Sequence, residues 1–356
     1  MLNPRAECFL IVALLSSICI AGEPAQGVLP EGMAPFDPAP LMTAVSQRIK
    51  GDKYRFAVLG DVRHAKNFSK LTAYLDETVK PDFVLTTGDM VYRGGGESGL
   101  SFWNQLANES GEEMRKRPWW PAIGNHEIAG DPITGKQATK SEAESPIAKH
   151  NRATGTENFT QFYGLKTAYY SFGFRNAVFI ALPFPLPNGV TALWLEDELK
   201  RAAAENKDIF VFNHMPFYTV GSKPADQVPN KSTRITQLLS RYGVRAVFSG
   251  HDHGYYRTIR DGITYITSAG GGAELYPGLR MKEALADDIY YYGVPESFTE
   301  KTATHQYVLH KGSALPDRIS TEPELFAVVV DVDGRNVSAY CVTATGDRWD
   351  EFRLSK

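Results

Sequence analysis

Cysteine is scarce in this chain of 356 residues, which contains three: Cys8, Cys19 and Cys341. A fold held together by disulfides needs an even set of cysteines at regular spacings, and no such set is present. Two of the three lie near the start of the chain, so removal of that segment would leave Cys341 alone. The sequence therefore predicts a fold that depends on its hydrophobic core and not on disulfides.

Excess positive charge is also absent. Lys and Arg total 38 and Asp and Glu total 41, which gives a formal net charge of -3. A surface that holds nucleic acid needs a strong positive potential to meet the phosphates. The chain also lacks a P-loop, a His-Glu-x-x-His zinc motif and a Gly-x-Ser-x-Gly nucleophile elbow. We therefore predict neither a nucleic-acid scaffold nor a serine hydrolase.

A long apolar run is missing as well. The stretch from Cys8 to Ala21 is shorter than the ~20 apolar residues of a membrane span, and it suits the core of a signal peptide. We predict a signal peptide over residues 1–21, export to the periplasm or the extracellular space, and no stable membrane insertion after cleavage. The alternative is an uncleaved anchor helix. Residues 22–50, rich in Pro, Gly and Ala, are predicted to form an extended lead-in.

What is present, in residues 51–356, is a series of short apolar runs typical of strands buried on both faces. Five of them are Tyr54–Leu59, Phe83–Thr87, Trp119–Ile123, Ile209–Phe212 and Val244–Ser249. Apolar residues at helical spacing over 67–80 and 193–204 lie between them, which predicts α/β layers with parallel strand pairs.

Other segments complete the predicted domain. Residues 172–182 and 263–268 are expected to form further strands, and Asp333-Gly334 a hairpin turn. Two long polar segments, near 128–161 and 274–323, are expected to be loops that wall the site and choose the substrate.

Polar clusters follow the five apolar runs. They are Gly60-Asp61, Gly88-Asp89, Gly124-Asn125-His126-Glu127, Asn213-His214 and Gly250-His251-Asp252-His253. Because a site in such a sheet lies beyond the carboxyl ends of the strands, these side chains are expected to meet there. Imidazole, carboxylate and amide donors suit Zn, Mn and Fe. The set exceeds the needs of one tetrahedral ion and is enough for two ions that share a carboxylate, which is the arrangement that hydrolyses phosphate esters.

The order of these clusters resembles that of the calcineurin-like metallophosphoesterases, and three motifs resemble the purple acid phosphatases more closely. Gly88-Asp89-Met90-Val91-Tyr92 is similar to their G-D-x-x-Y, and Val211-Phe212-Asn213-His214 to their V-x-x-H. His251-Asp252-His253-Gly254-Tyr255-Tyr256-Arg257 is similar to their H-x-H-x-Y-x-R. The resemblance implies a four-layer α/β/β/α sandwich of two mixed sheets, with a dinuclear metal site at the carboxyl ends of the strands.

The resemblance also implies the role of each residue. The first metal would be held by Asp61, Asp89, Tyr92 and His253. The second metal would be held by Asp89, Asn125, His214 and His251. His126 would hold a phosphate oxygen or protonate the leaving group. Glu127 would orient an imidazole. Arg63 would pair with a phosphate oxygen, and the alternative for it is a surface salt bridge.

The chain departs from the broad family at the first motif. Arg63 stands where that family has a metal-binding His, and His64 follows one residue late. Purple acid phosphatases lack that His and use the Tyr of the second motif, which is Tyr92 here. With Tyr92 as a ligand the resemblance implies Fe(III) plus a divalent ion (Fe, Zn or Mn). The alternative is that His64 ligates through a shifted loop, Tyr92 packs, and both ions are divalent.

The predicted function is an acid-phosphatase-like hydrolysis of phosphate monoesters through attack by a metal-bound hydroxide. Its partner would be a small-molecule phosphate ester. The first alternative is a phosphodiesterase that acts on nucleotides or lipid headgroups. The second is a secreted binding protein that kept the fold and lost catalysis. All expected ligands of the second metal are present, and those of the first are complete if Tyr92 serves, which favours an enzyme.

Overall fold

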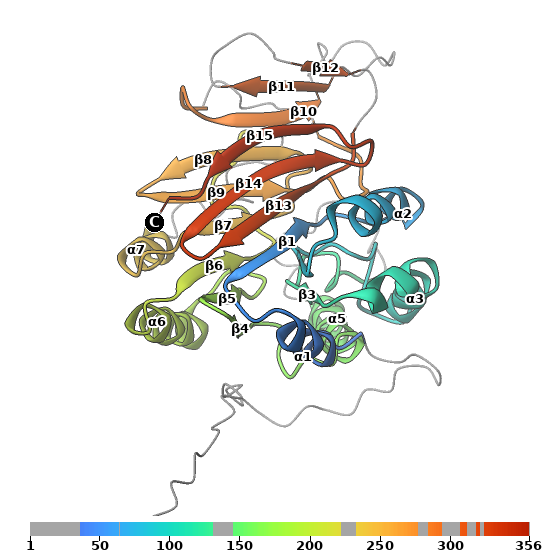
Figure 1. The fold of residues 1–356 in the computed structure, drawn as a ribbon. Helices are drawn as coiled ribbons and strands as arrows, with labels where there is room; N and C mark the ends of the chain where they lie inside the picture. The colour runs from blue at the N-terminus through green and yellow to red at the C-terminus, as the bar shows by residue number, and fades with distance from the viewer. Residues whose placement is uncertain are drawn as a thin grey trace, which may run out of the picture.

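The structure is a computed structural model that describes residues 36–63, 65–130, 145–221, 233–276, 284–293, 307–311, 318–320 and 324–355. In these residues two mixed β-sheets lie face to face, and helices cover their outer faces (Figure 1). The predicted signal peptide over residues 1–21 lies outside the described residues. No helix in the described ranges has the length and apolar character that a membrane crossing requires.

The first sheet has six strands, in the order β15-β14-β13-β1-β2-β3. Their bounds are β1 Lys53–Leu59, β2 Phe83–Thr86, β3 Trp119–Pro121, β13 Phe326–Asp333, β14 Asn336–Thr343 and β15 Arg348–Arg353. Strands β1, β2 and β3 run parallel, and β13 pairs antiparallel with β1. Residues 56–59 of β1 and all of β2 are buried, because both faces of the sheet are covered there.

The second sheet has nine strands, in the order β12-β11-β10-β8-β9-β7-β6-β5-β4. Their bounds are β4 Tyr170–Phe174, β5 Ala177–Ala181, β6 Asp208–Phe212, β7 Ala246–Ser249, β8 Tyr255–Arg260, β9 Ile263–Ser268, β10 Ile289–Gly293, β11 Tyr307–Lys311 and β12 Arg318–Ser320. Strands β5, β6, β7 and β9 are parallel neighbours. The carboxyl ends of β6 and β7 therefore meet at one edge of this sheet.

Three of the four hydrophobic clusters in the described residues hold the layers together. The core between the sheets is aromatic, and Phe56 of β1 contacts Phe83, Phe179 and Phe210 with ring centroids 5.3–5.5 Å apart. The outer face of the first sheet packs on α2 Ala65–Tyr74, a π-helical turn Leu75–Val79, α3 Gly99–Lys116 and α5 Pro146–Phe162. The outer face of the second sheet packs on α6 Gly189–Ala204 and α7 Thr233–Arg241. The predicted four-layer sandwich is therefore confirmed.

The five predicted strands are confirmed as β1, β2, β3, β6 and β7, and both predicted helical segments are helical. The hairpin at Asp333-Gly334 joins β13 to β14, with Gly334 at a φ of +62°. The expectation of one strand over 172–182 was wrong, because Arg175 turns the chain at a φ of 54° between β4 and β5.

Three other expectations were wrong where helix caps or sheet pairing outweighed a polar composition. The lead-in contains α1 Pro38–Arg48, whose first turn is capped by the Asp37 carboxylate. The segment 128–161 contains most of α5, capped by the Ser145 hydroxyl. The segment 274–323 contains β10, β11 and β12, which extend the second sheet. Parts of the last two segments, and all of His64, lie outside the described residues.

Candidate metal centre

The polar clusters lie where the parallel strands of the two sheets end. Asp61 follows β1 and Asp89 follows β2, whereas His251 and His253 follow β7 of the other sheet. Asp61, Asp89 and His251 have φ values of 57°, 55° and 71°, in the left-handed region that non-glycine residues rarely adopt. Such strained backbone is typical of functional sites.

Two glycines of these clusters are required by close approach. A Cβ at Gly250 would lie 2.5 Å from Oδ2 of Asp61, and one at Gly88, whose φ is +89°, would lie 2.9 Å from the backbone nitrogen of Gly124. Since both distances are shorter than any real Cβ contact, each motif begins with glycine for a steric reason. The two sheets can then bring their strand ends together.

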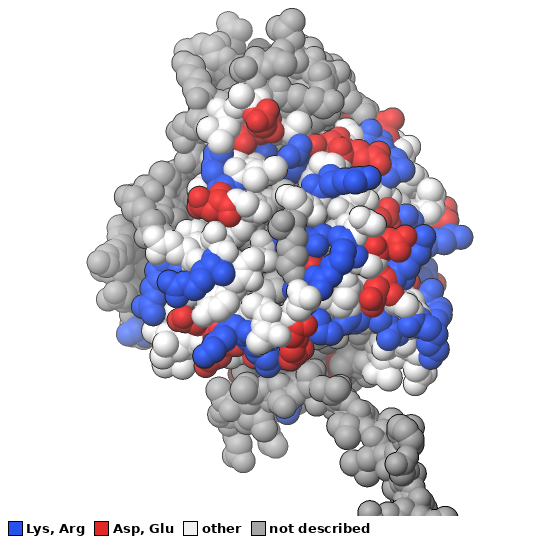
Figure 2. Space-filling model, turned by 60° about the vertical axis from the view of Figure 1, so that its left-hand side comes forward, with Lys and Arg blue, Asp and Glu red and all other residues white. Residues whose placement is uncertain are grey.

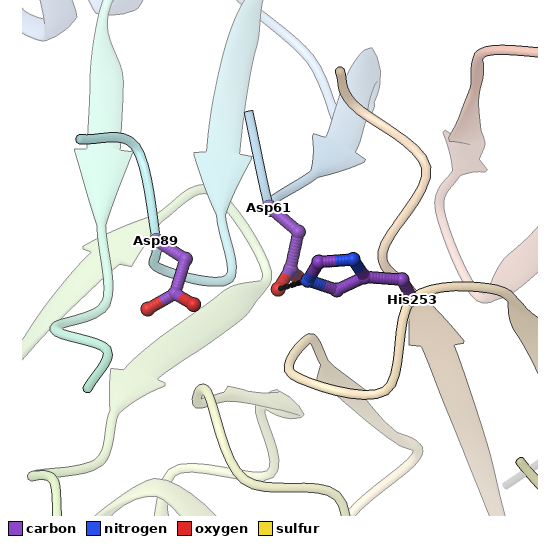
Figure 3. A group of neighbouring side chains, drawn as sticks. All are labelled: Asp61, Asp89 and His253. Atoms are coloured by element: carbon purple, nitrogen blue, oxygen red, sulfur yellow. Dashed lines mark ion pairs between the residues drawn. The ribbon is translucent and has the colours of Figure 1, made fainter. Parts of the chain in front are cut away.

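Three buried side chains form the first group of donors. Ligand atoms of Asp61, Asp89 and His253 all lie within 4.8 Å of one another (Figure 3). His253 Nε2 is 3.2 Å from Oδ1 of Asp61. Nδ1 of the same ring is 2.6 Å from the carbonyl oxygen of Glu274, which can only accept, so Nδ1 carries the proton. The lone pair on Nε2 of His253 therefore faces the two carboxylates, as a metal ligand requires.

Three more donors converge beside the first group. Oδ1 of Asn125 lies 2.8 Å from His214 Nε2 and 2.9 Å from His251 Nδ1, and the two imidazole nitrogens are 3.1 Å apart. Adjacent ligands of a tetrahedral ion with bonds of ~2.0–2.1 Å are about 3.3 Å apart, so the spacing fits one metal ion. Asp89 Oδ1 is 3.3 Å from His214 Nε2, which makes Asp89 the carboxylate common to both groups.

The protonation of His214 strengthens this fit. Its Nδ1 donates to the carbonyl oxygen of Thr87 at 2.8 Å, so its Nε2 lone pair points at the Asn125 amide oxygen. Two lone-pair atoms 2.8 Å apart repel each other unless a proton or a metal ion lies between them. The donor set therefore suits a cation at this position.

Charge at the centre is concentrated on two fully buried carboxylates. Burial alone would raise the pKa of Asp89, but the His214 and His126 imidazoles and the Arg63 guanidinium bring that pKa well below its ordinary value. Burial would also raise the pKa of Asp61, but the His253 imidazole, whose Nε2 is 3.2 Å away, outweighs it and the pKa is lowered. Both carboxylates are therefore ionised at neutral pH, the state that binds metal.

Arg63 and His126 lie on the partly open side of Asp89. Arg63 Nη2 donates to Asp89 Oδ2 at 3.0 Å, and its side chain is 13% exposed, so Arg63 forms an ion pair with a buried carboxylate of the centre. His126 Nδ1 donates to the carbonyl oxygen of Tyr92 at 2.6 Å, and its Nε2 is 3.8 Å from Asp89 Oδ2. Burial lowers the pKa of His126.

The sequence pattern of the calcineurin-like phosphoesterase family matches residues 54–255, more than half of the chain. The chain belongs to the calcineurin-like phosphoesterase family. Membership of this family implies a dinuclear metal site, and the described residues supply a buried group of donors for it.

Relatives within this family include purple acid phosphatases, as the motifs predicted. Purple acid phosphatase 21 of Arabidopsis thaliana is 26% identical over 242 residues, which are 64% of this chain and 52% of that protein. Tartrate-resistant acid phosphatase type 5 of Rattus norvegicus is 26% identical over 230 residues, 61% of this chain and 69% of that protein. The chain therefore spans about half the length of the plant relative.

Solved structures agree on the fold. Purple acid phosphatase PPD1 from yellow lupin seeds superposes with a TM-score of 0.57 and 15% identity, over 86% of this chain and 54% of that one. GAP50, the anchor in the inner membrane complex of Plasmodium, gives a TM-score of 0.55 and 14% identity, over 85% and 89%. At these identities the likeness shows the shared calcineurin-like fold and nothing about activity.

Glu127 has a different role from the one that the sequence predicted. We expected it to orient an imidazole. Its buried carboxylate instead accepts the backbone N–H groups of Asp89, Met90 and Gly124 at 2.7–2.8 Å, and that of Val91 at 3.4 Å. Burial, with Asp89 nearby, raises the pKa of Glu127 to about 7. Glu127 therefore holds the loop that carries Asp89.

Tyr92 differs from the other candidate ligands in exposure. Its side chain is 38% exposed, whereas Asp61, Asp89 and His253 are buried. The ring packs against Phe102 and His126, with centroids 5.9 and 5.7 Å away. Tyr92 thus lies on the same open side as His126, and its assignment as a ligand stays a prediction.

Several residues of the centre escaped sequence reasoning. The carbonyl oxygens of Thr87 and Glu274 orient His214 and His253. The ring of Tyr276 stacks on His253 with centroids 4.0 Å apart. A backbone carbonyl leaves no mark in a side-chain pattern, and residues 274–276 lie in a segment that composition assigned to a loop.

Proposed function

We propose that the chain is a metal-dependent phosphatase that hydrolyses phosphate monoesters at a dinuclear centre. The observation that supports it is the convergence of six buried or nearly buried donors at the strand ends. They are Asp61, Asp89, Asn125, His214, His251 and His253. Nitrogen and oxygen donors without thiolate suit Zn, Mn and Fe.

The proposed first metal ligands are Asp61, Asp89, Tyr92 and His253, with His64 in place of Tyr92 as the alternative. The proposed second metal ligands are Asp89, Asn125, His214 and His251. With Tyr92 we propose Fe(III) plus a divalent ion (Fe, Zn or Mn), and with His64 two divalent ions. When bound, such ions act as Lewis acids that stabilise charge on the phosphoryl oxygens.

The chain's own residues supply the remaining functions. Arg63 has a buried Nε with no hydrogen-bond partner among the described residues, and its fork-shaped guanidinium suits a phosphate oxygen. His126 has one ring nitrogen fixed by the Tyr92 carbonyl, so its other nitrogen is held in one orientation. We propose that this Nε2 holds a phosphate oxygen or donates a proton to the leaving group. Glu127 acts on the reaction only through the loop of Asp89.

Two further parts of the proposal concern organisation and export. We propose that residues 51–356 form the phosphoesterase domain and that residues 1–21 are a signal peptide that directs the protein out of the cytoplasm. Mass analysis of the amino terminus of exported protein checks the signal peptide, and an intact Met1 on that protein would contradict its cleavage.

The decisive experiment combines metal analysis with substrates. Protein purified without chelators is analysed for bound metal and assayed with p-nitrophenyl phosphate and bis-p-nitrophenyl phosphate. We expect close to two ions per chain and faster hydrolysis of the monoester. Preference for the diester would replace the monoester proposal by a phosphodiesterase. A protein with its full metal content that hydrolyses neither compound, nor any of a panel of phosphate esters, would overturn the proposal that the chain is an enzyme.

A further inference from the structure

A second hollow lies at the other end of the sheets. The metal centre follows the carboxyl ends of β1, β2, β6 and β7. This hollow is lined by residues at or before the amino ends of those strands, together with the hairpin of β13 and β14 and residues 353–355. Its volume is about 1150 Å³. We call it the amino-end pocket, and Tyr54, Arg245 and Arg335 are among the residues that line it. Figure 2 turns this end forward and shows Lys and Arg side chains gathered around a hollow, with Asp and Glu among them.

Two buried polar atoms of the amino-end pocket have no hydrogen-bond partner among the described residues. They are the hydroxyl of Tyr54, a residue 4% exposed, and Nε of Arg245, a residue 3% exposed. Buried polar atoms are nearly always paired with protein, water or ligand, because an unpaired one costs free energy. Both side chains line the pocket, so a molecule bound there would supply the missing partner.

The rest of the Arg245 side chain is firmly held. Its Nη1 donates to the carbonyl oxygens of Arg335 and Leu354, at 3.1 and 3.2 Å, and its Nη2 donates to Asp208 Oδ1 at 3.0 Å. These bonds join the β13–β14 turn, the end of the chain and the start of β6. The guanidinium is therefore preorganised before any ligand arrives, which lowers the entropy lost on binding.

Positive charge is in excess on the lining. Five cationic side chains face three carboxylates there. The carboxylates are already engaged: Asp331 with Arg55, Asp333 with Lys53, and Asp82 with Arg48. Arg245 and Arg335 share the single carboxylate of Asp208, at 3.0 and 3.3 Å from the same Oδ1. The single negative charge of Asp208 therefore balances only one of these two guanidinium groups.

We propose that the amino-end pocket binds a small organic anion through the Tyr54 hydroxyl and the Arg245–Arg335 pair. A guanidinium recognises phosphate and carboxylate by the same planar fork, so the shared chemistry is an oxyanion group on a larger body. The volume lies slightly above the ~300–1,000 Å³ typical of small-molecule sites, so a ligand of nucleotide size can enter. The site is remote from the metal centre and does not depend on the proposed phosphatase activity.

Calorimetric titration of the full, metal-loaded chain tests the proposal with three probes. They are a non-hydrolysable phosphonate analogue of AMP, adenosine 5′-carboxylate and uncharged adenosine. We expect at least one anion to bind and adenosine to bind at least about ten-fold more weakly, because a hydrogen bond to a charged group contributes most of the affinity. The tighter of the two anions identifies the group as phosphate-like or carboxylate.

Variants separate this site from the metal centre. Arg335→Gln, at an exposed residue, should weaken binding of the anion about ten-fold, and Tyr54→Phe about five-fold. Tyr54→Phe keeps the ring contacts with Phe83 and Phe174, so folding should be retained and is checked by thermal unfolding. Tyr163→Phe is the matched control, because Tyr163 is also buried with an unpartnered hydroxyl but lies outside the pocket.

Three results would overturn the proposal. They are no binding of either anion, equal binding of adenosine, and binding that both Tyr54→Phe and Arg335→Gln leave at the wild-type value. The last result would place the anion at the metal centre alone.

Discussion

The two halves of the metal centre differ in how completely the described residues build them. In the second half, Asn125, His214 and His251 place three donor atoms 2.8–3.1 Å apart. In the first half, Asp61 and His253 are in contact at 3.2 Å, but the proposed fourth donor, Tyr92, is 38% exposed. Asp89 belongs to both halves. We therefore expect changes in the second half to alter how much metal is bound, and changes in the first half to alter which metal is bound.

Removing a donor of the second half should have the largest effect. We expect Asn125→Ala and His251→Ala each to lower kcat/KM for p-nitrophenyl phosphate at least ~100-fold and to reduce bound metal. The reason is that even the outer partners of metal ligands contribute ~10–100-fold. The exposed Asn108→Ala in α3 is the control. Near-wild-type rates in both variants would contradict the proposed role of the second half, because its donors would then be dispensable.

His126→Ala should lower kcat about 100-fold while metal content stays at the wild-type value. A positioned acid or base contributes ~10²–10⁴-fold, and His126 contacts Asp89 only at 3.8 Å. Rate and metal content are measured on the same preparation, with the exposed His150→Ala as control. Loss of an ion from His126→Ala would indicate that His126 is a metal ligand, and the proposed ligands of both metals would then be wrong.

Glu127→Gln should act on stability more than on chemistry. The carboxylate accepts several backbone N–H groups around Asp89, and the amide of Gln would turn donor hydrogens toward them. Leaving buried donors unpaired costs about 1–3 kcal/mol, so thermal unfolding should shift down by several degrees. Glu112→Gln, at an exposed residue of α3, should not shift it. An unchanged unfolding temperature in Glu127→Gln would contradict its role in holding the Asp89 loop.

Tyr92→Phe should have its most informative effect on colour. If Tyr92 is a phenolate ligand, an Fe(III) in the first half gives a visible charge-transfer band, which the variant loses. The phenol ordinarily ionises near pH ~10, so a trivalent ion is the one suited to bind it in acid. The fold should persist because only one half-exposed oxygen is removed. A colourless, active wild type that is unaffected by Tyr92→Phe and crippled by His64→Ala would assign the first half to His64.

Local sequence was enough to locate the parallel strands and the motifs at their ends. Apolar runs such as Tyr54–Leu59 form largely buried strands. Gly88 and Gly250 stand where a Cβ would lie too close to neighbouring atoms. The segments that were misassigned have weak or polar patterns. In α5, the cue was Ser145-Pro146, a capping residue followed by a first-turn proline. Segment β10 is a strand because it pairs with β8, and this pairing is not visible in the sequence of β10 itself.

Residue order alone therefore predicted the family, the layers and a set of candidate donors, because hydrophobic periodicity and motifs can be recognised in the sequence itself. The tertiary structure decided how those donors are aimed. The tautomers of His214 and His253 follow from carbonyl oxygens of Thr87 and Glu274, 127 and 21 residues away along the chain. The role of Glu127 follows from the Asp89 loop, and the charge balance of the amino-end pocket follows from Arg335 meeting Asp208. These contacts join segments distant in sequence, and most use backbone atoms that every residue shares, so no local pattern encodes them.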